Sequence, residues 1–169
     1  GVEEDYVKAS GWYRRAGQAG QAPQQPAPQK QTETPQQLFA RYQQESDQTK
    51  RMEYLKKSAE TGYARAQAWM ALTYSQGYGV EKNAAEAARW LQRLAQQDGP
   101  EAWYWLGHCY FGGWGVAKAK VQAAGWFRKA ADQGHKDAQR ALADCYENGR
   151  GVPKDANQAA YWREKAKSN

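Results

Sequence analysis

His108 stands directly before Cys109, and this pairing suggests either a thiol nucleophile activated by a base or two metal ligands. If the segment is helical, however, adjacent side chains point about 100° apart, so the two cannot hydrogen-bond as a dyad. The other histidine, His135, is expected in a turn, so three or four ligands at metal spacing are not assembled. The sequence therefore predicts no nucleophilic centre and no metal site.

Three further patterns could carry chemistry, and none does so on closer inspection. Lys82, Lys118 and Lys154 each follow a Gly-x-Gly-Val segment, but no strand precedes it, as a phosphate-binding loop would require. Asp144 and Glu147 share one helical face, a spacing that is common on solvated surfaces. Hydrolysis of a small molecule such as a β-lactam would need a Ser and Lys arrangement for acyl transfer, which is absent. We predict a protein that is not an enzyme and carries no cofactor.

An internal repeat determines the elements that hold these residues. The motif Tyr-x-x-Gly-x-Gly-Val occurs three times at a spacing of 36 residues, beginning at Tyr74, Tyr110 and Tyr146. A tryptophan recurs at the same spacing, at positions 90, 126 and 162. A fixed period of roughly 20 to 50 residues is typical of a solenoid, in which each unit buries its apolar face against its neighbours. The sequence therefore predicts a repeat protein.

Each repeat is expected to contain two helices. Apolar residues at spacings of three and four predict a first helix over 66–75, and the two glycines after it allow a sharp turn. A second helix is predicted from Asn83 onward, and Asn83 and Asp155 can cap it in their repeats, whereas the middle repeat has Ala119 there. The buried stripe of the second helices is predicted to comprise Ala87, Trp90, Leu91 and Leu94, then Ala123, Trp126, Phe127 and Ala130, then Ala159, Trp162 and Ala166.

The repeat pattern divides the chain into six segments. Residues 1–20 match the second half of a repeat, with Trp12 equivalent to Trp126, so we expect a chain that begins inside a repeat of a longer array, or whose first helix packs on something supplied from elsewhere. Residues 21–34 are rich in Gln, Ala and Pro and predict an extended connection. A degenerate helical repeat is expected over 35–65, followed by complete repeats over 66–101, 102–137 and 138–169.

These units resemble Sel1-like repeats, which are related to tetratricopeptide repeats. The residues that carry the resemblance are Ala102, Leu106, Gly107, Tyr110, Gly113, Gly115, Val116, Ala123, Trp126, Ala131 and Gly134. The resemblance implies an all-α, right-handed superhelical solenoid of antiparallel helix pairs, with the first helix of each repeat lining the concave face. It also implies a non-catalytic adaptor or scaffold that binds another protein or an extended peptide. The alternative is a bacterial immunity protein that binds and inhibits a secreted effector enzyme such as a lipase.

The composition limits the class of partner and the cell compartment that we expect. The net charge of +6 is dispersed along the chain, whereas nucleic-acid binding needs basic residues clustered on one side, so no nucleic-acid partner is predicted. No run approaches the roughly 18 apolar residues of a transmembrane segment. Cys109 and Cys145 lie one repeat apart, too far for a disulfide, and are expected to be free, partly buried thiols. The composition and the resemblance favour a bacterial periplasmic or envelope-associated protein, with the cytoplasm as the alternative.

A partner would meet the positions of the first helices that are not needed for the core. We expect this concave surface to be aromatic in its middle and polar and acidic at its C-terminal end. The aromatic part is the stronger candidate for partner contacts, because aromatic residues dominate binding hot spots. Trp103 is expected in the core, Trp105 either in the core or in the groove, and Tyr104 and Phe111 in contact with a partner. The predicted partner-binding residues are Trp69, Leu72, Tyr104, Trp105, His108, Phe111, Arg140, Asp144 and Glu147.

Overall fold

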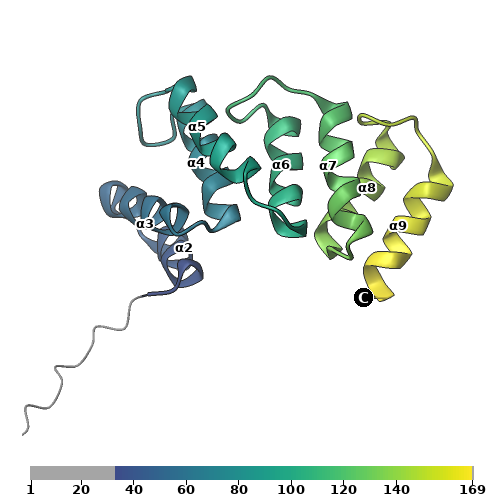
Figure 1. The fold of residues 1–169 in the computed structure, drawn as a ribbon, viewed down its shortest axis with the longest axis horizontal. Coiled ribbons are helices and arrows are strands. Elements are labelled where there is room, and N and C mark those ends of the chain that lie inside the picture. The colour runs from purple at the N-terminus through teal and green to yellow at the C-terminus, as the bar shows by residue number, and fades with distance from the viewer. Residues whose placement is uncertain (1–32, 169) are drawn as a thin grey trace, which may run out of the picture. The chain divides into compact units, whose positions relative to one another are not determined.

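The structure is a computed structural model that describes residues 33–168, and these residues form eight α-helices and no strand. In chain order the helices are α2 (Pro35–Gln44), α3 (Gln48–Glu60), α4 (Ala64–Gln76), α5 (Ala84–Ala95), α6 (Pro100–Gly112), α7 (Lys120–Asp132), α8 (Lys136–Asn148) and α9 (Ala156–Ser168). They pack as four successive antiparallel pairs, beginning with α2 and α3 and ending with α8 and α9 (Figure 1). The prediction of an all-α solenoid of helix pairs is confirmed. The predicted partial repeat at 1–20 and most of the connection at 21–34 lie outside the described residues.

Helices α2 and α3 form a pair within the segment 35–65, for which a degenerate helical repeat is predicted. Thr34 and Gln37 form a reciprocal capping box at the start of α2, and Asp47 accepts the backbone N–H of Lys50 at 2.9 Å at the start of α3. Phe39 and Leu55 are buried where the two helices meet. The later first helices begin at Ala64, Pro100 and Lys136, two residues before the repeat boundaries drawn at 66, 102 and 138.

The two glycines of each Gly-x-Gly-Val turn have different functions. The first glycine, for example Gly77 with φ of 79°, ends its helix in the left-handed conformation that only glycine adopts at little cost. The second packs against the preceding repeat, because a Cβ added to Gly115 would lie 2.5 Å from the carbonyl oxygen of Ala87 in α5. Gly151 approaches the carbonyl of Lys120 in the same way. The motif therefore ends one helix and docks the turn on the neighbouring repeat.

The predicted caps of the second helices are confirmed. Asn83 accepts the N–H of Glu86 and Asp155 accepts that of Gln158, both at 3.0 Å. Ala119 occupies the same position before α7 and offers no side-chain acceptor. Of α5, α7 and α9, the three second helices that follow a Gly-x-Gly-Val turn, only α7 thus lacks this stabilising bond.

The hydrophobic core is divided into three clusters along the solenoid axis. One joins α2 to α5, one joins α4 to α6, and one joins α6 to α9. The predicted stripe of the second helices is buried, with one exception: Trp126 is only partly buried, because its ring lies at the surface beneath the Lys129 ammonium, 5.5 Å from the ring centre. Trp103 is also partly buried and packs between two of the clusters, with the Lys129 ammonium 3.9 Å from its ring centre.

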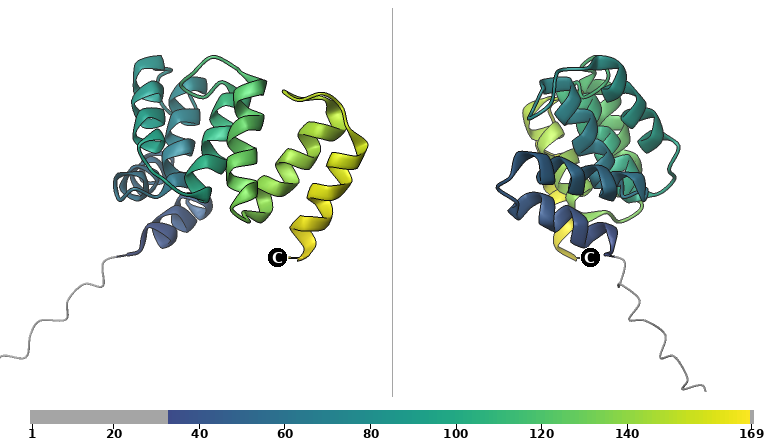
Figure 2. Two further views of the ribbon diagram at one scale, coloured as in Figure 1. Left: turned by 45° about the vertical axis from the view of Figure 1, so that its right-hand side comes forward. Right: turned by 90° about the vertical axis from the view of Figure 1, so that its left-hand side faces the viewer.

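Neighbouring first helices are not equally close along the solenoid. Helices α4 and α6 pack against each other directly, whereas α6 and α8 are not among the closely packed pairs. Figure 2 shows the α8–α9 pair inclined relative to the α6–α7 pair.

Candidate functional site

Helix α6 carries a cluster of aromatic side chains, centred on Tyr104. The Tyr104 ring lies 4.7 Å from the rings of both His108 and His135, and 5.2 Å from that of Trp105. Phe127 of α7 closes the cluster, 6.1 Å from Tyr104 and 5.2 Å from His108. These rings gather because α6 turns its small residues, Ala102, Gly107 and Cys109, toward the core. Tyr104, Trp105 and His108 remain only partly buried.

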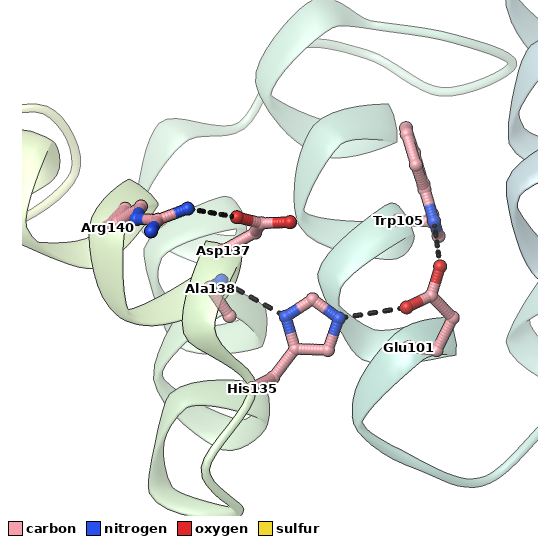
Figure 3. Close-up of polar contacts among 6 residues, drawn as sticks. All are labelled: Glu101, Trp105, His135, Asp137, Ala138 and Arg140. Atoms are coloured by element: carbon pink, nitrogen blue, oxygen red, sulfur yellow. Dashed lines mark hydrogen bonds and ion pairs between the residues drawn. The ribbon is translucent and has the colours of Figure 1, made fainter. Parts of the chain in front are cut away.

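Glu101 links this cluster to the next repeat. Its carboxylate accepts a hydrogen bond from the Trp105 Nε1 at 2.7 Å and lies 2.9 Å from the His135 Nε2 (Figure 3). His135 Nδ1 accepts the backbone N–H of Ala138 at 3.2 Å and so caps α8. Because Nδ1 is an acceptor, the neutral ring carries its proton on Nε2 and donates it to Glu101. The His135 hydrogen bond is the main reason that the pKa of Glu101 is lowered, assisted by Trp105 and opposed by burial.

His108, inside the aromatic cluster, differs from His135 in its burial and in its hydrogen bonding. Burial lowers the pKa of His108, although the charge of Asp137 opposes the shift. Its Nε2 atom is buried and has no hydrogen-bond partner among residues 33–168. His108 is therefore a neutral ring at pH 7, which suits it for packing on other rings and not for holding a charge.

Trp69, in the N-terminal part of the predicted surface, packs on rings of α2. The Trp69 ring lies 6.2 Å from Phe39 and 6.0 Å from Tyr42, so it packs α4 against α2. Leu72 is partly buried. Arg65 of α4 touches both this region and the α6 cluster, with its guanidinium 4.9 Å from the Phe39 ring centre and 5.5 Å from that of Trp105.

Arg140, Asp144 and Glu147 are exposed on α8, but each carries a charge that is paired. Arg140 lies 2.9 Å from Asp137 (Figure 3). Arg163 of α9 binds Glu147 and lies 3.7 Å from Asp144. Arg163 was not among the predicted residues, although its repeat position offered a signal, because Leu91 and Phe127 are apolar there. The C-terminal end of the surface is thus polar with balanced charge, and the expected acidic character is reduced.

A pocket of about 170 Å³ lies where α6 and α8 separate. Three of the predicted residues, His108, Phe111 and Asp144, line it. The rest of its lining is formed by Phe127, Ala141, Cys145 and Arg150. The pocket joins the aromatic cluster to the polar face of α8, so the structure brings the middle and the C-terminal parts of the predicted surface together around one opening.

The side chains of this surface provide ring contacts and hydrogen bonds. The Cys109 and Cys145 thiols are free and fully buried, more so than expected, and burial raises their pKa values to about 12 and about 11. Between residues 33 and 168, no three His, Cys, Asp or Glu side chains gather to hold a metal ion. Over the same range, no helix combines the length and apolar character needed to span a membrane.

Comparison with known proteins identifies the family. The Sel1 repeat model matches residues 1–21, 64–99, 100–135 and 136–169, and the chain therefore belongs to the Sel1 repeat family. Members of this family are generally non-catalytic scaffolds for protein–protein interaction. No curated protein matches the chain.

Two solved structures show the same fold. A protective antigen of uropathogenic Escherichia coli with an SLR fold is 33% identical, with a TM-score of 0.56, over 79% of this chain and 30% of its own length. A Sel1 repeat protein from Oxalobacter formigenes is 30% identical, with a TM-score of 0.60, over 80% of this chain and 57% of its own length. The chain thus spans less than two thirds of either protein.

Proposed function

We propose that this protein is a non-catalytic interaction module that binds another protein, or an extended peptide, on the surface formed by α6 and α8. The observation that carries the proposal is the cluster of Tyr104, Trp105 and His108 beside an open pocket. These rings are held in place by neighbours yet keep exposed area, as binding hot spots do. Rigid aromatic side chains also lose little conformational entropy when a partner binds.

Electrostatics favour a polypeptide over a highly charged ligand. Asp144 and Glu147 are both engaged by Arg163, and Arg140 is engaged by Asp137, so these three charged residues of α8 are paired beside the apolar rings. A polypeptide supplies apolar side chains and backbone hydrogen-bonding groups in the proportion that such a surface can satisfy. The family's general use as a protein scaffold supports the same conclusion.

The test is affinity capture with the full chain and two variants. Phe111→Ala removes a ring from the pocket wall, and Tyr161→Ala removes an exposed ring from α9 as the matched control. Both should retain the helical circular dichroism of the native chain. We expect a partner that the native chain and Tyr161→Ala retain and that Phe111→Ala loses. Equal retention by both variants would refute the proposed surface.

The identity of the captured polypeptide distinguishes a scaffold from an immunity protein. One stoichiometric enzyme, inhibited on binding, would support an immunity protein that neutralises an effector such as a lipase. Several weaker partners would support a scaffold. If the native chain captures no polypeptide from the source cells under conditions in which it stays folded, the interaction function itself is wrong.

A further inference from the structure

The internal repeat shows why the pocket between α6 and α8 exists. The pocket residues Ala141, Asp144 and Arg150 occupy the repeat positions that Trp105, His108 and Trp114 hold one repeat earlier. Three large rings at the boundary of α4 and α6 are thus replaced by a methyl group, a carboxylate and a guanidinium at the boundary of α6 and α8.

The two boundaries differ in packing as this exchange predicts. At the first, the His108 ring lies 5.5 Å from Trp105 and 6.2 Å from Trp114, and α4 packs directly on α6. At the second, α6 and α8 separate and leave about 170 Å³ open to the surface. The rings of Trp105, His108 and Trp114 therefore fill, between α4 and α6, the space that stays open as a pocket between α6 and α8.

The lining suits a ring. A closed apolar cavity of about 150 Å³ holds benzene, so a pocket of this size accommodates one aromatic side chain. Its walls offer Phe111, Phe127 and the neutral ring of His108 for edge and face contacts. The methyl group of Ala141 stands where Trp105 begins in the preceding repeat.

Arg150, at the opening of the pocket, favours a ligand with a negative charge. Arg150 forms no ion pair with any of residues 33–168, and its guanidinium lies 5.9 Å from the Phe111 ring centre. The one carboxylate of the lining, Asp144, is 3.7 Å from Arg163, which also binds Glu147. The free charge at the opening is therefore positive, and its complement is a carboxylate on the ligand.

We propose that this pocket receives an aromatic side chain of the bound polypeptide, with a neighbouring carboxylate of that polypeptide paired to Arg150. The proposal rests on the proposed function and names the feature of the partner that this surface selects. The incoming ring takes the place that Trp105 and Trp114 share at the boundary between α4 and α6.

The first experiment uses 3-indolepropionate, which joins an aromatic ring to a carboxylate, with indole and propionate as separate probes. Each is titrated into the full ¹⁵N-labelled chain while amide chemical shifts are recorded. We expect saturable shifts for 3-indolepropionate at the amides of Phe111, Ala141, Cys145 and Arg150. Indole should bind the same amides more weakly, and propionate should move none. Absence of shifts at these amides, or shifts centred elsewhere, would overturn the proposal.

Variants separate the pocket from the rim. Ala141→Trp introduces the residue found one repeat earlier and should abolish the shifts. Ala141→Leu fills less of the pocket and should weaken binding, so it provides the test if the tryptophan variant does not fold. Ala160→Trp, at an exposed position of α9, is the matched control and should bind as the native chain does. Arg150→Gln should weaken 3-indolepropionate about two- to fivefold and leave indole unchanged, the range of an exposed ion pair. Unchanged binding by Ala141→Trp and Ala141→Leu would refute the pocket.

The two proposals fail in different ways. If a captured polypeptide depends on Phe111 but binds Ala141→Trp as tightly as the native chain, the interaction function stands and the ring-accepting pocket is wrong. If 3-indolepropionate binds at the pocket but no polypeptide is captured, the pocket stands and the interaction function is wrong.

Discussion

Gly107 of α6 lies directly against the Phe127 ring of α7, so close that a Cβ at Gly107 would overlap the ring. The equivalent pairs in the flanking repeats are Ala71 with Leu91 and Ala143 with Arg163. The smallest residue thus stands opposite the one aromatic side chain of the three, and alanine stands where the opposite side chain is not aromatic. The pairing indicates a packing constraint across the two helices of one repeat.

Gly107→Ala should therefore destabilise the protein, against the usual effect of alanine in a helix. Alanine is favoured over glycine by up to about 1 kcal/mol in a helix interior. Overpacking against Phe127 costs about 1–3 kcal/mol and should dominate. Urea unfolding followed by circular dichroism measures the change.

The control for this variant is its combination with Phe127→Leu, the residue found in the preceding repeat. In that background the overlap is removed, so Gly107→Ala should become neutral or stabilising. A stabilising Gly107→Ala in the native background would show that the ring moves aside freely and that the packing argument is wrong.

Ala119→Asp should stabilise α7 by about 1 kcal/mol, because it adds the missing cap. The backbone is already prepared: φ and ψ are −144° and 84° at Ala119, close to the −142° and 99° of the capping residue Asn83. Asn83→Ala should cost a similar amount in its own repeat. Thermal unfolding of both variants tests the pair, and a lowered midpoint for Ala119→Asp would contradict it.

The carboxyl group of Glu101 should titrate below its usual range, and the shift should depend on His135. His135→Ser keeps a cap for α8 but cannot reach Glu101, so the pKa of Glu101 should rise toward its ordinary value. A ¹³C titration of the Glu101 carboxyl in both proteins measures this directly. An unchanged midpoint would mean that the bridge between α6 and α8 does not form in solution.

The same bridge predicts the pH dependence of stability. A lowered folded-state pKa means that the contribution of Glu101 is complete above its unfolded pKa and is lost as the pH falls through the folded value. Glu101→Gln should therefore flatten the loss of thermal stability below about pH 4.3, the ordinary pKa of a glutamate. Equal slopes for the native chain and the variant would exclude this contribution.

Cys109 and Cys145 should resist thiol reagents while the protein is folded. Burial keeps both groups protonated at pH 8, with pKa values of about 12 and about 11, and also blocks access to Cys109, which lies outside the pocket lining. Ellman's reagent should react slowly with the native chain and rapidly with both thiols in urea. Fast reaction of Cys109 in the native protein would show that its helix pair opens readily, whereas fast reaction of Cys145 would show that the reagent enters the pocket that this residue lines.

The periodic part of the structure could be predicted from the sequence because each repeat encodes the same local geometry. Gly77 ends α4, Asn83 caps the start of α5, and Trp90 and Leu91 are buried, all as their spacing predicts. Such features depend on backbone conformation and on helical periodicity, which a single segment carries within itself. The turn glycines and the apolar periodicity also predicted that the helices form pairs.

The candidate site depended on contacts between segments that do not repeat. Trp69 packs on Phe39 because the degenerate repeat places a ring there, and Glu101 meets His135 across a boundary between repeats. The opening beside Ala141 exists because small and polar side chains face α6 from α8 and the two helices separate. By itself, the sequence determined most of the residues that each helix turns inward, with Trp126 as an exception, since helical periodicity is a local property. Only the tertiary structure decided which outward residues meet, because the distance and inclination between neighbouring helices follow from side chains on both sides of each boundary.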